Sequence, residues 1–169
     1  MSILSSTKTG KAAFLVPESK EELKQLILKE IKEKGYNCDL NHILTHKITD
    51  MSYLFQYSHF NGDISKWDVS NVRHMQNMFF QSKFNNDISN WNVSNVRNMY
   101  GMFAQSKFNS DISKWNVSNV ENMEHMFFIS EFNSDISNWE INSKCETIDI
   151  FYKCPIRDEY KPKQNGIIV

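Results

Sequence analysis

The sequence predicts an α/β fold, a right-handed solenoid of 24-residue repeats with an N-terminal capping helix. The main observation is a strict period, because Trp67, Trp91, Trp115 and Trp139 are 24 residues apart. The second is an apolar stripe that follows a helix-capping signal before the first repeat. A single unit of this size cannot bury its own aromatic side chains, so the units must stack. Other columns keep the same step: Phe55, Phe79, Phe103, Phe127 and Phe151; Phe60, Phe84, Phe108 and Phe132; Ile64, Ile88, Ile112 and Ile136; Met51, Met75, Met99 and Met123.

Within one repeat, two patterns of apolar residues alternate. Val72, Met75, Met78 and Phe79 share one face at helical spacing, which predicts a short helix or 3₁₀ segment. Residues 87–93 carry the strand formers Ile, Trp and Val and predict a short strand with a turn. We therefore expect strands on one side of the stack and short helices on the other.

Both ends of the repeat region read as caps. Ser19 and Glu22 form a capping box, and Gly35 is placed to end the helix that follows. The apolar stripe of this helix consists of Leu23, Leu26, Ile27 and Ile31. The predicted organisation is an N-terminal tail at 1–17, a helical cap at 18–47, four repeats plus a degenerate fifth at 48–154, and a C-terminal tail or cap at 155–169.

Composition limits the classes of partner and compartment. The formal net charge is −1 and the pI is about 6.5, which disfavours nucleic acid. No stretch approaches the ~20 apolar residues of a membrane span, so we expect no membrane insertion. We find no signal-peptide pattern and expect a cytoplasmic protein as written, or a cell-surface one if the sequence is a trimmed fragment. Cys38, Cys145 and Cys154 lack any CxxC spacing and are expected to be reduced.

The repeated string F-N-x-D-I-S-x-W-x-V-S-N-V-x-x-M-x-x-M-F resembles the BspA-like leucine-rich-repeat family. The segment before the repeats is similar to that family as well, so that the resemblance spans about residues 18–154. It implies a leucine-rich-repeat-like solenoid. Many members of that family are bacterial surface proteins or adhesins that bind host proteins. The resemblance brings no catalytic residues.

Residues that carry chemistry elsewhere favour structural roles here. The column Asp63, Asp87, Asp111 and Asp135 allows a cation ladder, but turn capping by each carboxylate is the favoured interpretation. The column Asn71, Asn95 and Asn119 favours an internal amide ladder. The histidines lack metal-site spacing, and no nucleophile or phosphate-loop motif is present. We therefore expect no enzyme activity, no cofactor and no metal.

A binding surface is expected where the columns change from repeat to repeat. Aromatic residues and arginine at such positions are typical of interface hot spots. The predicted partner-binding set is Tyr53, Tyr57, Arg73, Gln76, Phe80, Arg97, Tyr100 and Phe128. Packing of Phe80 and Phe128 into a neighbouring coil is the structural alternative. A rival polar face is formed by Lys66, Asp68, Asn90, Asn92, Lys114, Asn116, Asn138 and Glu140.

These features predict a non-enzymatic protein–protein interaction module, a monomer or weak oligomer with one protein partner. The first version is an intracellular binder or inhibitor, such as a protein encoded by a phage or another mobile element. Alternatives are an adhesin-like fragment of a bacterial surface protein and a self-assembling structural solenoid. Nucleic-acid binding through Arg73 and Arg97 is opposed by Glu121 and Glu124 on the same columns.

Overall fold

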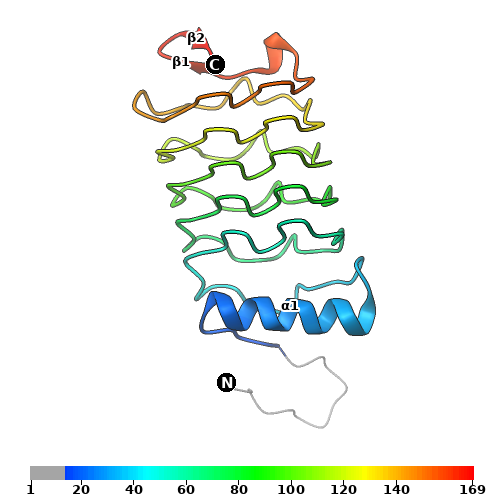
Figure 1. The fold of residues 1–169 in the computed structure, drawn as a ribbon. Coiled ribbons are helices and arrows are strands. Elements are labelled where there is room, and N and C mark those ends of the chain that lie inside the picture. Colours follow the sequence, from blue (N-terminus) through cyan, green and yellow to red (C-terminus); the bar gives the residue numbers. More distant parts are fainter. Residues whose placement is uncertain (1–13) are drawn as a thin grey trace.

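The structure, a computed structural model, describes residues 14–169. Its repeats are layered along one axis, with helix α1 (Lys20–Lys34) at one end (Figure 1). At the other end lie the 3₁₀ helix η1 (Asp158–Tyr160) and a two-stranded antiparallel sheet, β1 (Lys163–Gln164) with β2 (Ile167–Ile168). All regular elements of the described residues thus lie outside the repeats.

Helix α1 begins and ends where the capping signals predict. The side chain of Ser19 accepts a hydrogen bond from the N–H of Glu22, and Gly35 ends the helix with a φ of 86°. Leu23 and Ile27 are buried against the first repeat. The predicted helix is therefore confirmed, and it covers the apolar end of the stack.

The segment before α1 is docked along the cap. The N–H of Leu15 donates to the carbonyl of His42 at 3.0 Å, and the N–H of Leu44 donates to the carbonyl of Leu15 at 2.8 Å. Part of the predicted tail at 1–17 is therefore paired with the body. Residues 1–13 of that tail lie outside the described residues.

The prediction of an α/β solenoid is wrong, because residues 48–154 contain neither an α-helix nor a strand. The stretch predicted as a helix, 72–79, and the one predicted as a strand, 87–93, consist of turns and irregular chain. The physical reason is a left-handed backbone twice in every repeat, which a right-handed helix of L-residues excludes. These positive-φ positions are Tyr53, Tyr57, Asn77, Gln81, Gly101, Gln105, His125, Ile129, Asp149 and Lys153.

Each repeat contributes one seven-residue segment of consecutive turns, which we call a turn rung. The turn rungs are 51–57, 75–81, 99–105, 123–129 and 147–153. In the first of them, the N–H groups of Leu54 and Gln56 donate three residues back, closing turns. In the turn 51–54 the left-handed residue Tyr53 stands at the third position, where a type II turn requires a positive φ, and Tyr57 stands at the third position of the turn 55–58. The same pattern recurs in all five turn rungs.

The turn rungs are joined by a regular ladder of backbone hydrogen bonds. The N–H of Phe55 donates to the carbonyl of Met78 at 2.9 Å, and its equivalents at Phe79, Phe103 and Phe127 donate in the same way. Four such bonds, from the first, third, fifth and seventh residues, form at each of the four junctions between turn rungs. A chain of parallel bridges at Asp50, His74, Asn98, Asn122 and Glu146 runs alongside. The N–H groups of these four residues donate to the next rung, so they are not available for the hydrogen bonds within an α-helix.

The core is a set of aromatic columns that run along the stack axis. Phe55 and Phe79 stack with ring centroids 5.5 Å apart and planes within 1°, and the column continues to Phe103, Phe127 and Phe151. A parallel column of Phe60, Phe84, Phe108 and Phe132 is fully buried. Burying each ring contributes roughly 2–3 kcal/mol. The predicted core columns are thus confirmed, although the backbone around them differs.

The tryptophans tie each repeat to the one before it. The indole N–H of Trp115 donates to the carbonyl of Ile88 at 3.1 Å, and Trp67, Trp91 and Trp139 make the equivalent bond at the same distance. All four side chains are only 3% exposed. The sequence period predicts the burial of Trp, whereas the bond between repeats is visible only in the structure.

The last repeat is completed by the C-terminal segment on one side only. The N–H of Ile136 donates to the carbonyl of Tyr160 at 3.0 Å, and Glu140 forms a bridge to Lys163. Residues 155–164 therefore continue the side of the stack opposite the turn rungs. The turn rung 147–153 is the last of its row. In the earlier rungs, the first, third, fifth and seventh N–H groups donate to the next rung. In this rung those N–H groups have no acceptor within residues 14–169; they belong to Thr147, Asp149, Phe151 and Lys153.

Substitution of one tryptophan tests the tie between repeats. We expect Trp115→Phe to lower the free energy of unfolding by about 2 kcal/mol, because a hydrogen bond and part of a packed ring are lost. Urea unfolding followed by circular dichroism measures this. Tyr57→Phe, an exposed site, is the control and should change stability by less than about 0.5 kcal/mol. A similar small change for Trp115→Phe would show that the indole bond does not hold the repeats together.

Amide hydrogen exchange tests the ladder. Phe127 and Phe151 occupy the same position in successive turn rungs, but only the N–H of Phe127 has an acceptor within the described residues, the carbonyl of Ile150 at 2.9 Å. We expect the Phe127 amide to exchange more slowly than that of Phe151, by a factor on the order of 10³ or more. NMR-detected exchange at neutral pH measures both. Equal protection of the two amides would contradict the open end of the ladder.

Candidate functional site

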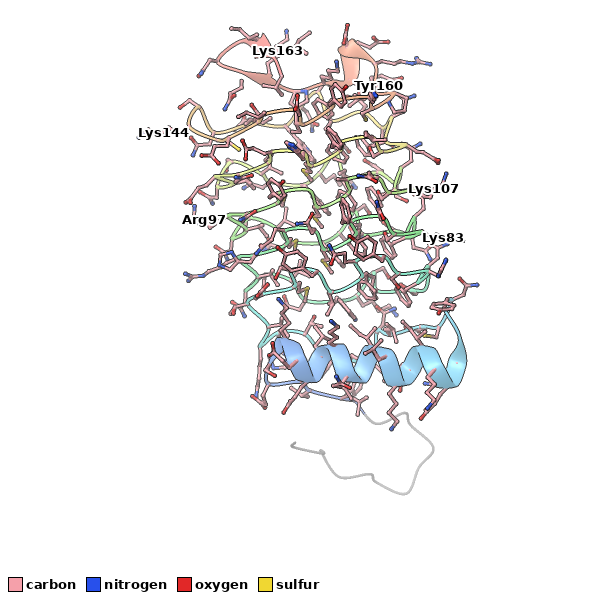
Figure 2. The ribbon with its side chains drawn as sticks, viewed as in Figure 1. Lys83, Arg97, Lys107, Lys144, Tyr160 and Lys163 are labelled. Atoms are coloured by element: carbon pink, nitrogen blue, oxygen red, sulfur yellow. The ribbon has the colours of Figure 1, made fainter. Side chains whose placement is uncertain are left out.

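The turn rungs form one continuous surface, which we call the turn face. The second, third, sixth and seventh residues of the rungs lie at this surface, apart from the buried Ser52, Gly101 and Ala104, while the first, fourth and fifth point into the core. Figure 2 shows its two edges: Arg97 lies on one side of the stack, and Lys83 and Lys107 lie on the other. The turn face lies between these edges and holds the residues that vary from repeat to repeat.

Six of the eight predicted partner-binding residues lie on the turn face. Tyr53, Tyr57 and Tyr100 are exposed, and the side chains of Phe80 and Phe128 are half-buried. The remaining member of the set, Gln76, is half-buried. Its side-chain carbonyl oxygen is enclosed without a hydrogen-bond partner among the described residues. The structure thus gathers these residues on one surface, and their role in binding stays a prediction.

The two predicted arginines lie beside the turn face. Arg73 and Arg97 precede their turn rungs by two residues, and both are exposed. Arg97 donates to the carbonyl of Asn119 at 3.1 Å and lies 3.9 Å from the carboxylate of Glu121. The positive charge of this edge is therefore partly neutralised in the next repeat.

Aromatic side chains on the turn face contact one another across rungs. Tyr57 meets Phe80 edge to face with centroids 5.4 Å apart. Further along, His125 stacks on Tyr100 at 5.5 Å and on Phe128 at 5.1 Å. Packing of Phe80 and Phe128 against neighbouring coils, the structural alternative, is therefore present, but both rings keep part of their surface exposed.

Two residues that the predicted set omits complete the surface. Tyr152 stacks on Phe128 with centroids 5.1 Å apart, and its side chain is 46% exposed. It is 24 residues beyond Phe128, so the repeat period contains the signal that places it on the turn face. His125 sits between two aromatic rings, with its Nδ1 enclosed and unpartnered within residues 14–169. The sequence carries no signal that predicts this enclosure of His125 between two rings.

Two small residues, Gly101 and Ala104, occupy the third turn rung. Ala104 is 3% exposed and lies between Phe80 and Phe128 in the column of sixth residues. Gly101 has a φ of 57°, and a Cβ there would lie 2.5 Å from the side-chain oxygen of Asn77. Both small residues are buried, so that the third rung presents Tyr100 and Gln105 at the turn face.

A groove with a mixed polar and apolar lining separates α1 from the first turn rung. It encloses about 460 Å³. Leu28 and Tyr36 are each about half exposed at its rim, and Tyr53 and Tyr57 line the side formed by the turn rung. The ammonium of Lys20 lies 5.7 Å from the ring centre of Tyr53 and pairs with Asp50 at 3.0 Å. The groove therefore extends the aromatic surface onto the helix.

A buried carboxylate fixes α1 to the segment that follows it. Glu30 is 6% exposed and is bound by the ammonium of Lys34 at 2.5 Å and by Nε2 of His42 at 3.2 Å. Burial alone would raise the pKa of Glu30, but the hydrogen bond from Lys34 and the nearby charges lower it. Glu30 is thus held ionised between α1 and the segment that follows it.

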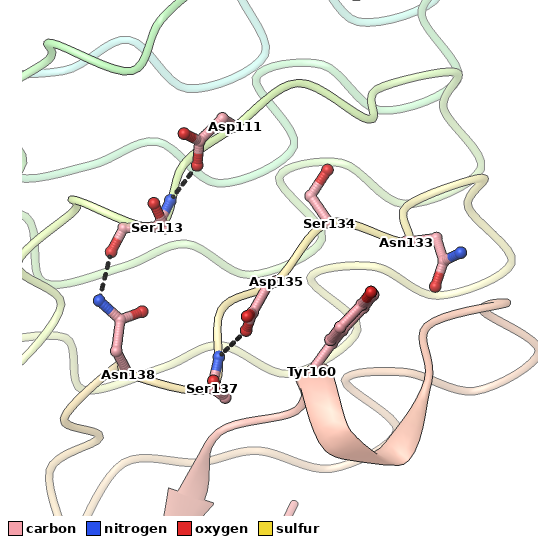
Figure 3. Close-up of a pocket in the computed structure, with 8 residues that line it drawn as sticks. All are labelled: Asp111, Ser113, Asn133, Ser134, Asp135, Ser137, Asn138 and Tyr160. Carbon is pink, nitrogen blue, oxygen red and sulfur yellow. Dashed lines mark hydrogen bonds between the residues drawn. The ribbon is translucent and has the colours of Figure 1, made fainter.

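A second, polar pocket of about 560 Å³ lies near η1 (Figure 3). Asp111 accepts the N–H of Ser113 at 2.8 Å, and Asp135 accepts the N–H of Ser137 at 2.9 Å. Tyr160 closes one side of the pocket. No cluster of three or more His, Cys, Asp or Glu side chains that could hold a metal ion occurs within residues 14–169. The carboxylates of this pocket are engaged in holding turns.

The same geometry recurs along the whole aspartate column. Asp63 and Asp87 each accept the N–H of the serine two residues on, at 2.9 Å. This hydrogen bond lowers the pKa of all four carboxyls below the ordinary aspartate value. The prediction that each Asp caps a turn is confirmed. The asparagines of the column Asn71, Asn95 and Asn119 form no ladder with one another, because each amide donates to a backbone carbonyl of the preceding repeat.

The three cysteines are free, as expected for reduced thiols. Burial raises the pKa of Cys145 to about 11 and raises that of Cys154 in the same direction. These thiols are protonated at neutral pH, because the thiolate would be formed in an apolar environment. Neither cysteine is poised as a nucleophile.

The fold and the turn face define a stacked-repeat protein with one variable surface. A family model described as "Mycoplasma protein of unknown function, DUF285" matches residues 24–128 and again 50–160. The chain belongs to this family. The resemblance to the BspA-like leucine-rich-repeat family is therefore wrong, because the matching family is a distinct one, and the adhesin-like interpretation based on it is withdrawn.

Comparisons with curated proteins and with solved structures found no match. Within residues 14–169, no helix has the length and apolar character needed to cross a membrane.

A pH series tests the role of the aspartate column. Unfolded Asp titrates near pH ~4, and the folded carboxyls titrate lower, so the unfolded chain binds more protons in acid. Their contribution to stability is therefore present above about pH 4 and is lost as pH falls through the folded pKa values. We expect Asp87→Asn/Asp111→Asn to match the parent near pH 7 and to lose less stability by pH 3.

The control for this series is built into the chain. Asn92 and Asn116 already cap equivalent turns through their side-chain oxygens, so Asn is a competent cap. Urea unfolding at several pH values measures the difference between parent and variant. An unchanged acid sensitivity in the double variant would show that these carboxylates do not contribute.

Proposed function

We propose that the chain is a non-enzymatic protein-binding module that engages its partner through the turn face. The observation that carries the proposal is the contrast between columns: the core positions of the turn rungs repeat with little change, whereas the exposed ones vary and are rich in aromatic residues. Tyr53, Tyr57, Tyr100 and Tyr152 are each at least 36% exposed. The fold does not need these rings for its core.

The composition of the turn face supports a protein partner. Large, rigid aromatic side chains that keep a polar end contribute much of the energy of protein interfaces. The surrounding charges are mixed, as the pairs Arg97–Glu121 and Lys107–Glu131 show. A nucleic-acid partner would instead favour a continuous basic track.

Affinity capture with matched baits tests this function. We expect Tyr57→Ser/Tyr100→Ser to lose at least one partner protein that the parent chain retains, because each exposed ring at an interface is worth about 2 kcal/mol or more. The control bait is Lys66→Ser/Lys114→Ser, two exposed lysines off the turn face, and it should keep the partner. Mass spectrometry of the retained proteins gives the comparison. Identical sets from the parent and the tyrosine variant would reject the turn face as the binding surface.

A further inference from the structure

The ladder of the turn rungs has a direction. At every junction the N–H groups belong to the earlier rung and the carbonyl groups to the later one, as in the bonds from Tyr53 to Gln76 and from His125 to Ile148. An ordinary β-strand alternates donors and acceptors along each edge. The turn rungs separate them, so that one edge of every rung consists of donors alone.

The two ends of the ladder differ in which backbone groups lack a partner and in which segment lies over them. At the first rung the free groups are carbonyls, and α1 lies over that end, with the ammonium of Lys20 bonded to the side chains of Asp50 and Ser52. At the last rung the free groups are N–H donors. No acceptor within residues 14–169 takes the N–H of Asp149, Phe151 or Lys153. Helix α1 lies over the acceptor end, whereas the donor end meets only side chains of the C-terminal segment: Gln164 contacts the Thr147 side chain, and the Lys161 ammonium lies 5.9 Å from the ring centre of Phe151.

The open end is continuous with the turn face, and it carries the exposed charged side chains of Asp149 and Lys153 beside exposed apolar ones. Ile148 is 64% exposed and Tyr152 is 46% exposed. The Tyr152 ring stacks on Phe128 in the preceding rung, and the ammonium of Lys153 lies 5.4 Å from its centre. A row of donors thus runs beside an exposed aromatic ring.

The charge of this edge selects its occupant. A row of unpaired N–H groups carries partial positive charge without any compensating carbonyl. A β-strand placed there would bring N–H groups of its own, and those facing the donor row would stay unpaired, at about 1–3 kcal/mol for each one buried. A proline-rich segment has carbonyls but lacks the N–H groups, and its extended form exposes those carbonyls. Its rings also pack against aromatic side chains.

We propose that the last turn rung binds a proline-rich segment of the partner protein. The N–H groups of Asp149, Phe151 and Lys153 donate to its carbonyls, and its pyrrolidine rings pack on Tyr152 and Phe128. This inference rests on the proposed protein-binding function and names the chemistry of the partner.

NMR titration of the full chain with synthetic decaproline tests the assignment. We expect the amide resonances of Asp149, Phe151 and Lys153 to shift and their hydrogen exchange to slow. A Ser-Gly peptide of equal length and an alternating Thr-Val peptide should leave them unchanged. Tyr152→Ser should weaken decaproline binding about tenfold, the factor that 1.4 kcal/mol represents, whereas Lys66→Ser should not alter it.

Three results would overturn this inference. The first is decaproline leaving these amides unshifted at millimolar concentration, and the second is a Ser-Gly peptide shifting them equally. The third is a shift that grows with protein concentration without peptide, which would assign the donor row to a second copy of the chain.

The two proposals fail separately. A captured partner that is lost with Tyr57→Ser/Tyr100→Ser but kept with Tyr152→Ser would leave the protein-binding function standing and reject the proline-rich site. Decaproline binding at the donor row, together with a capture that ignores the turn-face variants, would support the site and reject the broader binding surface.

Discussion

The structure depends on the hydrogen bond from a turn rung to the next one. For that bond to form, the chain must place two residues of each rung in the left-handed region, which costs roughly 1–2 kcal/mol for a residue with a side chain. Each rung gains four inter-rung bonds at its junction, at about 1 kcal/mol each, and it aligns the Phe columns for stacking. The strain is therefore offset only in the stacked state, so that one repeat cannot hold this backbone by itself.

The 24-residue period predicts the core but does not predict the backbone. Residues that recur at each step, such as Trp91 and Phe79, are buried as expected, because stacking must cover them whatever the local conformation. The left-handed positions carry weak sequence signals. Gly101 and Asn77 are typical of positive φ, whereas Tyr53 and Ile129 in left-handed positions are not. Contacts between repeats override the local preference, and helical spacing therefore predicts the wrong element.

The candidate site is predictable to the extent that it follows the period. Variation between repeats points to Tyr53, Phe80 and Tyr100, and all three lie on the turn face. The enclosure of His125 and the groove beside α1 depend on contacts between segments that the sequence alone does not bring together. The contribution of Tyr152 follows from the fifth repeat, which is irregular in sequence yet keeps the turn-rung geometry.

The direction of the ladder has a mechanical consequence. The bonds between turn rungs run along the stack, so a force that separates the two ends of the molecule loads the junctions in series. Each junction then bears the tension through its four ladder bonds, the indole bond of its tryptophan and the packing beside them. Because the junctions carry the same set of ladder bonds, we expect such a protein to extend by releasing repeats one after another.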